Sequence, residues 1–255
     1  MEFLSRFFKK KEPKEQLPLI DISNVIKSDM HSHLLPELDD GSKSLDESIE
    51  MIEGLIALGY TNLICTPHVM HDFYRNPTNT ILNSLEVLKK ELIKRSINIS
   101  IQASAEYYFD EELKSRVASK DILTFGKEKY LLFELSYFNE HQGIFEGVSE
   151  IVQAGYTPVL AHPERYPYYV MNLKQYDLLK GMGLKFQINL LSLAGHYGDS
   201  AIHGANYLID RGFVEFIGTD IHRESHLPAL RKALRSEKLH QLVNSGNLLN
   251  NSLFS

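Results

Sequence analysis

Short apolar runs alternate with longer amphipathic stretches from residue 25 onward. Seven runs have the length and the β-branched or aromatic content of strands: 25–33, 61–67, 97–104, 130–136, 157–163, 184–190 and 214–220. Between them, apolar residues recur at helical spacing over 44–59, 77–96, 143–155, 173–183 and 200–212. Alternating units of this kind predict parallel strands joined by helices on right-handed crossovers.

The length of 255 residues and the seven βα units indicate one domain of the α/β class. A distorted (β/α)7 barrel, similar to a TIM barrel, accommodates these units. An open doubly wound sheet is the alternative, but no G-x-G-x-x-G segment follows the first run, so the dinucleotide fingerprint is missing. We therefore predict an N-terminal extension over 1–24 and a single barrel domain over 25–255.

Charge and cysteine content narrow the class of protein further. The formal net charge of −6 gives no support for nucleic-acid binding, which normally shows as a basic excess. Cys65 is the one cysteine, so an intramolecular disulfide is excluded and the cytosol is the favoured compartment. No apolar run reaches the roughly 20 residues that span a bilayer, and no signal peptide is evident. The sequence therefore indicates a cytoplasmic protein.

The N-terminus combines apolar and basic residues. One face of a short helix here would carry Phe3, Leu4, Phe7 and Phe8, with Arg6 and Lys9 to Lys11 nearby. This pattern is typical of a weak anchor on an anionic membrane surface or of a docking peptide. The simpler interpretation, which we favour, is a terminus that is frayed or that packs on a neighbouring subunit.

Polar residues gather where the predicted strands end. The first run ends in "DMHSHLLPELDDG", and the later ends carry "TPH", "AEYY", "FEL", "AHPERY", "QIN" and "GTDIH". In a βα barrel the carboxyl ends of all strands face one mouth, so these side chains should converge. Each segment taken alone is also typical of an ordinary polar turn, and "DDG" is also typical of the start of a helix. Together, however, they would place several carboxylates in one buried mouth, which is costly without a cation.

The residue types indicate a metal site. Histidine and carboxylates without cysteine are typical ligands of Zn²⁺, Mn²⁺ or Fe²⁺, and residues at i and i+2 of a strand point to the same side. The nine candidate ligands are His31, His33, Asp40, His68, Glu106, Glu134, His162, Asp220 and His222. Asp39 competes with Asp40, because spacing does not separate adjacent acids. Nine ligands exceed the needs of one ion and indicate two or three.

Other residues near the strand ends have two interpretations each. Eight aromatic residues could line the mouth of the barrel or could pack between loops and helices. They are Tyr107, Tyr108, Phe109, Tyr137, Phe138, Tyr166, Tyr168 and Tyr169. His196 follows the sixth run and could line the mouth. Cys65 lies within an apolar strand without a phosphate-binding loop, so we interpret it as a core thiol and not as a nucleophile.

From about residue 28 to about residue 240, the order and spacing of these motifs resemble the PHP (polymerase and histidinol phosphatase) superfamily. Within it, "H-x-H-LLP-x-x-DDG" and "AHPERY" are most similar to the bacterial manganese-dependent protein-tyrosine phosphatases of capsular and exopolysaccharide operons. The resemblance implies a trinuclear centre that binds Mn²⁺, with Fe or Zn as alternatives, and allows more than a monomer.

The resemblance also implies a role for each ligand. The first metal would be held by His31, His33, Glu106 and Asp220, the second by Glu106, Glu134 and His162, and the third by Asp40, His68 and His222. Arg165 matches the phosphate-binding arginine of these proteins. A second arginine normally follows the final D-x-H; here Arg223 and Arg231 are the candidates, and we select Arg223.

The implied function is hydrolysis of phosphotyrosine in a protein, in the control of capsular or exopolysaccharide synthesis. A membrane tyrosine autokinase is the implied partner. Two other hypotheses remain open: a phosphoesterase for histidinol phosphate or a sugar phosphate, and a non-catalytic regulator that binds phosphotyrosine. Every ligand position is filled, which argues against the non-catalytic regulator.

Overall fold

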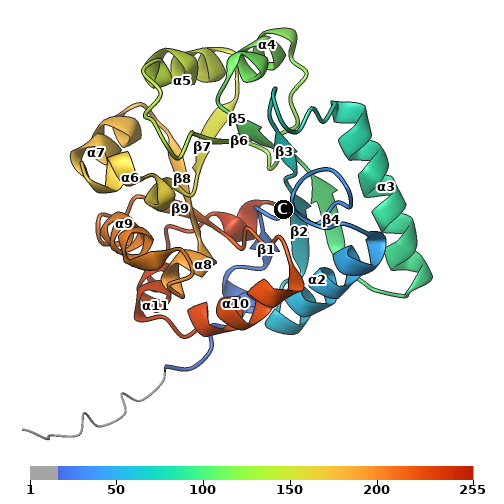
Figure 1. Cartoon of the computed structure of the whole chain (residues 1–255). Helices are drawn as coiled ribbons and strands as arrows, with labels where there is room; N and C mark the ends of the chain where they lie inside the picture. The colour runs from blue at the N-terminus through green and yellow to red at the C-terminus, as the bar shows by residue number, and fades with distance from the viewer. Residues whose placement is uncertain (1–16, 255) are drawn as a thin grey trace, which may run out of the picture.

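A ring of parallel strands surrounded by helices forms the core of the computed structural model, which describes residues 17–254 (Figure 1). The described strands are β1 (Ser28–Asp29), β2 (Asn62–Cys65), β3 (His68–Val69), β4 (Ser100–Ala103), β5 (Glu106–Tyr108), β6 (Tyr130–Glu134), β7 (Thr157–Ala161), β8 (Lys185–Asn189) and β9 (Val214–Gly218). They form two sheets, ordered β1-β2-β4 and β3-β5-β6-β7-β8-β9, and all pairings within them are parallel.

The nine described strands occupy seven positions of the barrel, because two strands are interrupted. β2 and β3 are separated by Thr66 and Pro67, and β4 and β5 by Ser104 and Ala105. Proline has no N–H to donate to a neighbouring strand, so Pro67 breaks the ladder at this point. Its carbonyl still accepts from the Glu106 N–H at 3.1 Å, which keeps the two interrupted strands aligned.

The first and last strands close the ring. Ser32 and Ile221 form an isolated parallel bridge. Next to it, the His33 N–H donates to the Ile221 carbonyl at 3.0 Å and the Asp220 N–H donates to the His31 carbonyl at 2.8 Å. The predicted distorted (β/α)7 barrel is thus confirmed. The first predicted strand, 25–33, is shorter than expected: β1 covers two residues, and Ser32 pairs separately.

The five predicted helices are present with shifts of one or two residues at their ends. They are α2 (Leu45–Leu58), α3 (Thr78–Lys94), α5 (Ile144–Gln153), α7 (Lys174–Gly181) and α9 (Gly198–Asp210). The predicted capping box of α2 is present, since the Ser44 hydroxyl accepts from the Glu47 N–H. Gly59 ends this helix in the left-handed conformation, as expected of a helix stop.

Further helices were not predicted. Three of them have seven to nine residues: α4 (Glu111–Ser119), α10 (Leu227–Ala233) and α11 (Glu237–Asn244). The others are short: α1 (Ile22–Val25), α6 (Pro167–Val170), α8 (Leu190–Leu193) and the 3-10 turns η1 (Pro163–Arg165), η2 (Glu224–His226) and η3 (Asn250–Ser252). α4 buries only Leu113 and Val117, so its apolar periodicity is weak. Its start is fixed instead by Asp110, which accepts from the Leu113 N–H.

Two apolar clusters hold the architecture. The larger lies between the strands and the surrounding helices. The smaller fills the barrel interior with Met30, Ile64, Phe125, Tyr130, Leu132, Val159, Ala161, Phe216 and Leu253. Near the end of the chain, the Asn250 side chain donates to the Ser28 and Ile217 carbonyls at 2.9 and 2.8 Å. This segment therefore covers the amino-terminal ends of the strands and leaves the carboxyl ends open.

Residues 17–24, which we assigned to the N-terminal extension, contact the barrel. Ile22 is buried, and the Ile20 N–H donates to the Leu234 carbonyl at 3.0 Å. The division into 1–24 and 25–255 stays a prediction. The proposed apolar and basic helix face over Phe3–Lys11 lies outside the described residues. None of the helices in residues 17–254 combines the length and apolar character needed to cross a bilayer.

Candidate metal centre

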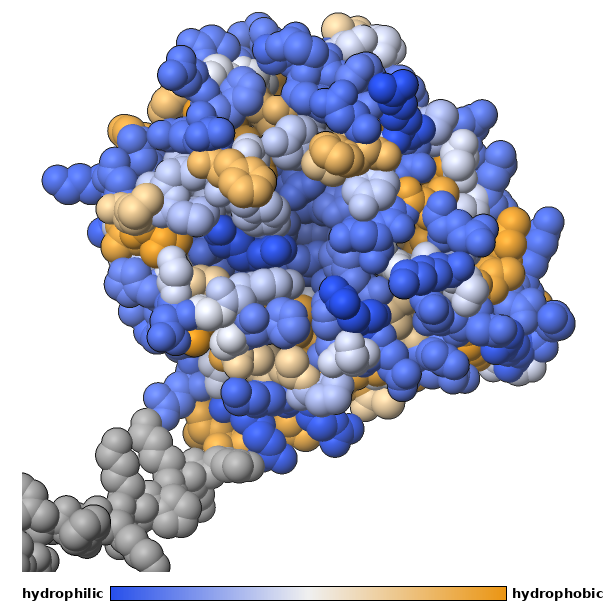
Figure 2. Space-filling model, viewed as in Figure 1, coloured by the Kyte–Doolittle hydropathy of each residue, from blue (hydrophilic) through white to orange (hydrophobic). Residues whose placement is uncertain are grey.

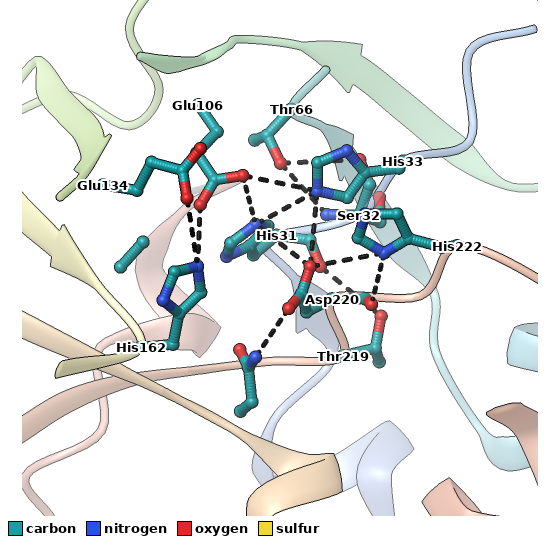
Figure 3. Close-up of polar contacts among 12 residues, drawn as sticks. His31, Ser32, His33, Thr66, Glu106, Glu134, His162, Thr219, Asp220 and His222 are labelled. Atoms are coloured by element: carbon teal, nitrogen blue, oxygen red, sulfur yellow. Dashed lines mark hydrogen bonds and ion pairs between the residues drawn. The ribbon is translucent and has the colours of Figure 1, made fainter. Parts of the chain in front are cut away.

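All nine predicted ligands converge at the carboxyl ends of the strands. They come from the segment after β1, the loop before α2, β3, β5, β6, and the turns after β7 and β9. Figure 3 shows His31 at the middle of the cluster, with Glu106, Glu134 and His162 on one side and His33, Asp220 and His222 on the other. Ligand atoms lie within 4.8 Å of one another in four groups, so the cluster has the dimensions of a polynuclear site.

One group joins the first and last strands. His31, His33 and Asp220 belong to it. The His31 Nε2 atom lies 3.4 Å from Asp220 Oδ1, and the His33 Nε2 atom lies 3.3 Å from the same oxygen. Glu106 Oε2 approaches both imidazoles, at 3.2 and 3.5 Å. The four side chains expected around the first metal thus lie close together, and their role as ligands stays a prediction.

Glu106 is shared by two further groups. It lies with His31 and His162 in one and with His68 and Glu134 in the other. The His162 Nε2 atom is 2.9 Å from Glu106 Oε1 and 4.0 Å from Glu134 Oε2. The position of Glu106 between the groups fits the bridging role that the resemblance implies.

The fourth group contains His33, Asp40, His68 and His222. Asp40 Oδ1 lies 3.5 Å from the Nε2 atoms of both His68 and His222. His68 also presents Nδ1 to Glu134 Oε1 at 3.0 Å, so the structure places it between this group and that of Glu106. Asp40 is the most exposed of the nine side chains, which puts this group nearest to solvent.

The structure separates the two adjacent acids. Asp40 reaches the ligand group, whereas Asp39 lies beneath it and accepts from His33 Nδ1 at 2.7 Å. Asp39 also accepts from the backbone N–H groups of His68 and Gly41 at 3.0 and 2.9 Å. A carboxylate that holds the outer nitrogen of a ligating histidine fixes the orientation of the ring. Burial opposes its ionisation, yet His33 holds the pKa of Asp39 below its usual value.

Two orienting residues were not predicted. Gln187 Oε1 lies 2.8 Å from His31 Nδ1 and accepts from the His162 N–H at 3.3 Å. Asn189, at the end of the sixth predicted strand, donates to Asp220 Oδ2 at 2.6 Å. The two residues are at i and i+2 of β8, so both amides point into the barrel. This spacing of two amides in an apolar run is the signal that could have identified them.

Backbone geometry at the site is unusual. His162 and Asp220 have positive φ values of 33° and 51° although neither is glycine. Such conformations cost energy and concentrate at functional sites. Two glycines permit close approach: a Cβ at Gly41 would overlap His33, and a Cβ at Gly218 would lie 2.7 Å from the His31 Cβ. The glycines of the "DDG" and "GTD" segments therefore allow the backbone to pack closely against His33 and His31.

The buried carboxylates of the cluster need positive charge nearby to stay ionised. Burial opposes ionisation of Glu106, but His31 and His68 hold its pKa well below the usual value. Conversely, burial disfavours the charged form of His68, yet Glu106 raises its pKa to about 9. Without an ion, the imidazolium groups thus neutralise the acids.

Two buried atoms test whether cations fit. Among residues 17–254, His68 Nδ1 and Glu106 Oε2 are buried and lie 3.1 Å apart as an ion pair, but neither atom makes a well-directed hydrogen bond. Buried polar atoms are normally satisfied, so such atoms require an explanation. Nitrogen and oxygen donors that face one another at short range are the ligand set of Zn²⁺, Mn²⁺ or Fe²⁺. The residues present therefore fit a cluster of divalent ions.

Arg165 lies beside the cluster. Its Nη1 donates to Asp220 Oδ2 at 3.0 Å. Its guanidinium carbon is 4.8 Å from the ring centre of Tyr137 and 4.0 Å from that of Tyr197. Arg223 lines the same cavity, whereas Arg231 is an exposed residue of α10 that does not line it. Of the two candidates for the second arginine, Arg223 is therefore the one at the site.

A cavity of 880 Å³ opens over the centre. His196 lines it, as do Tyr108, Tyr137 and Phe138 among the predicted mouth aromatics. For Tyr107, Phe109, Tyr166 and Tyr169 the alternative interpretation, packing, holds, because their side chains are buried; Tyr168 is not part of the cavity wall. Cys65 is a buried free thiol in β2, and burial raises its pKa well above the usual value. It is therefore not poised as a nucleophile.

Comparison with known proteins agrees with this geometry. Tyrosine-protein phosphatase YwqE of Bacillus subtilis (strain 168) is 29% identical over 229 residues, which cover 87% of this chain and 90% of the relative. Tyrosine-protein phosphatase CpsB of Streptococcus pneumoniae is 28% identical over 211 residues, 80% of this chain and 87% of the relative.

Comparison with solved structures also finds similarity to tyrosine phosphatases. A crystal structure from the work on YwqE of Bacillus subtilis and CpsB of Streptococcus pneumoniae, described as metal-dependent tyrosine phosphatases, superposes with a TM-score of 0.75 at 27% identity. It covers 88% of this chain and 94% of the other. A Listeria monocytogenes lactonase, with a TM-score of 0.52 at 12% identity, shares the fold alone.

The family model for capsular polysaccharide synthesis, CpsB/CapC, matches residues 27–244. This range includes every candidate ligand and both arginines at the cavity. The resemblance inferred from the motifs is thus confirmed at the level of the family, and the chain belongs to the CpsB/CapC family.

Proposed function

We propose that this chain is a metal-dependent phosphatase that hydrolyses phosphotyrosine in proteins. The observation that carries the proposal is the convergence of nine histidine and carboxylate side chains beneath a cavity that Arg165 and Arg223 also line. The related proteins YwqE and CpsB are named tyrosine-protein phosphatases, which supports the same reaction. Control of capsular or exopolysaccharide synthesis is the corresponding biological role.

Two or three divalent ions, with Mn²⁺ as the expected metal and Fe or Zn as alternatives, would be held by the nine side chains. Glu106 would be shared between ions, because its two oxygens face different histidines. Bound cations of this kind supply Lewis acidity for a phosphoryl group and lower the pKa of a coordinated water. The orienting contacts of Asp39, Gln187 and Asn189 fix the ligands before any ion arrives.

The arginines provide the phosphate-binding part of the mechanism. A guanidinium group binds phosphate with two parallel hydrogen bonds, which fixes its orientation. Arg165 is held at the edge of the cluster by Asp220, which accepts from Nη1, and the other N–H groups of the guanidinium would donate to a phosphoryl oxygen. Arg223 lies at the same cavity and would contribute a second positive charge. No side-chain nucleophile is needed, in agreement with the buried position of Cys65.

The test is an assay of metal-stripped protein on a phosphotyrosine peptide, repeated after addition of Mn²⁺, Zn²⁺ or Mg²⁺. Phosphoserine peptide and histidinol phosphate serve as contrast substrates. Metal-dependent hydrolysis of the phosphotyrosine peptide is the expected result. Strong preference for histidinol phosphate would instead support a small-molecule phosphoesterase, and phosphotyrosine binding without turnover with any of the three metals would support a regulator.

The natural substrate would be a phosphotyrosine protein such as a membrane tyrosine autokinase, with the phosphatase in the cytoplasm. The N-terminal residues 1–14 would assist by weak association with the membrane surface. Deleting these residues and measuring liposome binding tests this part, because unchanged binding would remove the membrane role. Nucleic acid is not a proposed ligand, given the net charge of −6.

A further inference from the structure

Two phenylalanine side chains stand exposed at the wall of the catalytic cavity. Phe73 is 77% exposed and Phe138 is 89% exposed, and both line the cavity above the metal centre. Figure 2 shows the cavity as a hollow in a mostly hydrophilic face, with apolar groups beside its opening. Exposed apolar side chains that gather at a functional cavity mark a surface for binding.

Phe73 is held at the tip of a tight turn. Met70 and Tyr74 form an antiparallel bridge, with hydrogen bonds of 3.0 and 3.1 Å in the two directions. The ring of Tyr74 stacks on His68, with 5.5 Å between the ring centres and an interplanar angle of 14°. One residue of the pair 73–74 thus faces the candidate ligands while the other faces solvent.

Phe138 is presented in the same way from another loop. Its backbone N–H donates to the Ser136 hydroxyl at 3.1 Å, which forms a turn directly after β6. The preceding Tyr137 stacks on His162 with 5.8 Å between ring centres and an interplanar angle of 21°. Both exposed rings are therefore fixed to the metal centre through an adjacent tyrosine, and their exposure is built into ordered turns.

The residues at the floor of the cavity determine which part of a bound substrate reaches Phe73 and Phe138. The candidate ligands and Arg165 would bind the phosphoryl group, so the rest of the substrate extends toward the opening. A cavity of 880 Å³ is at the upper end of the range for ligand sites, which leaves space beyond a single phosphotyrosine side chain.

We infer that Phe73 and Phe138 bind apolar side chains next to the phosphotyrosine of a protein substrate, so that the enzyme selects its targets by the residues that flank the phosphate. The inference rests on the proposed function. Aromatic rings bury much apolar area at low conformational cost, which suits them to recognise the side chains of an extended segment.

Two phosphotyrosine peptides test the inference. They are identical except that leucine flanks the phosphotyrosine on both sides in one and serine in the other. For the metal-loaded wild type, we expect kcat/KM about tenfold higher for the leucine peptide, mainly through KM. The double variant Phe73→Ser/Phe138→Ser should reduce this ratio to near one. Ile93→Ser is the matched control, because Ile93 is also 77% exposed but lies on α3 and does not line the cavity; it should keep the wild-type ratio.

The outcomes separate this inference from the proposed function. No preference in the wild type, or a preference that the double variant retains, overturns the role of the two rings. Hydrolysis of p-nitrophenyl phosphate without hydrolysis of either peptide overturns the proposed function instead. Hydrolysis of p-nitrophenyl phosphate also shows whether the double variant is folded and active. If it is not, the ratio of kcat/KM for the two peptides is measured with the single variants Phe73→Ser and Phe138→Ser.

Discussion

The guanidinium carbon of Arg165 lies 4.0 Å from the ring centre of Tyr197, and the Tyr197 hydroxyl lies 3.4 Å from Asp220 Oδ2. The same carboxylate oxygen accepts from Arg165 at 3.0 Å. Tyr197 thus contacts both the arginine and the acid that holds it. A cation over an aromatic face is stabilised by the ring, most strongly when water is partly excluded. The ring of Tyr197 therefore positions the group that would bind phosphate.

Replacing Tyr197 with leucine removes the ring and should raise KM for a phosphotyrosine peptide about fivefold, corresponding to a loss of about 1 kcal/mol. Tyr197→Phe keeps the ring and should stay within about twofold of the wild type. The measurement is steady-state kinetics at saturating metal, with metal content measured in parallel. Equal KM values for the two variants would show that stacking does not orient Arg165.

Metal content should respond differently to two carboxylates. Glu106 faces several histidines and belongs to two ligand groups, whereas Asp40 belongs to one. We expect Glu106→Gln to lose more than one ion per chain and Asp40→Asn to lose one at most. Elemental analysis after dialysis against trace Mn²⁺ gives the count. The same loss from both variants would contradict the position of Glu106 as the shared ligand.

Asp39 should affect metal affinity although it is not among the nine. Asp39→Asn weakens the support of His33 Nδ1, and loss of such an orienting partner typically lowers metal affinity about 10- to 100-fold. Titration of the apoprotein with Mn²⁺ measures the change. Unaltered affinity would show that His33 is oriented by packing alone.

The sequence identified the chemistry of the site better than its arrangement. The nine ligand types and their strand-end positions follow from local pattern, because every βα unit delivers its polar end to the same mouth. The choice between Asp39 and Asp40 depends on the path of the loop before α2, which no periodicity encodes. Tyr197 acts through contacts with Arg165 and Asp220, which lie on other βα units, so no local pattern reveals its role either.

The fold shows a similar division. The seven strand positions and five helices were predictable, since each has a strong apolar period. The breaks after Cys65 and Ala103 were not, because they depend on how neighbouring strands pair around Pro67. α4 escaped prediction because only two of its residues are buried.

Gly41 should not tolerate a side chain. A Cβ at this position would overlap the carbonyl oxygen and Cβ of His33, so Gly41→Ala forces backbone movement beneath a ligand. We expect a loss of about 1–3 kcal/mol in the free energy of unfolding, together with reduced metal binding. Gly181→Ala is the matched control: nothing lies within 4 Å of its Cβ, and alanine in a helix should be neutral or stabilising by up to about 1 kcal/mol. Urea unfolding of both variants gives the comparison, and equal stabilities would contradict the close contact.

Cys65 should be dispensable for catalysis. It is buried in β2, and Cys65→Ala removes one packed atom at a cost of about 1 kcal/mol in stability. Hydrolysis of a phosphotyrosine peptide should remain metal-dependent and near the wild-type rate. A variant that folds, binds metal and yet loses all activity would point to thiol chemistry instead.

The hydrogen bonds between residues 31–33 and 220–221 have a consequence for biosynthesis. The ribosome makes His31 and His33 early, but their partners Asp220 and His222 emerge almost two hundred residues later. A nascent or truncated chain therefore lacks Asp220, one of the three residues of the group that joins the first and last strands, and it lacks the hydrogen bonds that close the ring. We therefore expect that only a nearly finished polypeptide completes this group, and that a partly synthesised chain has no phosphatase activity.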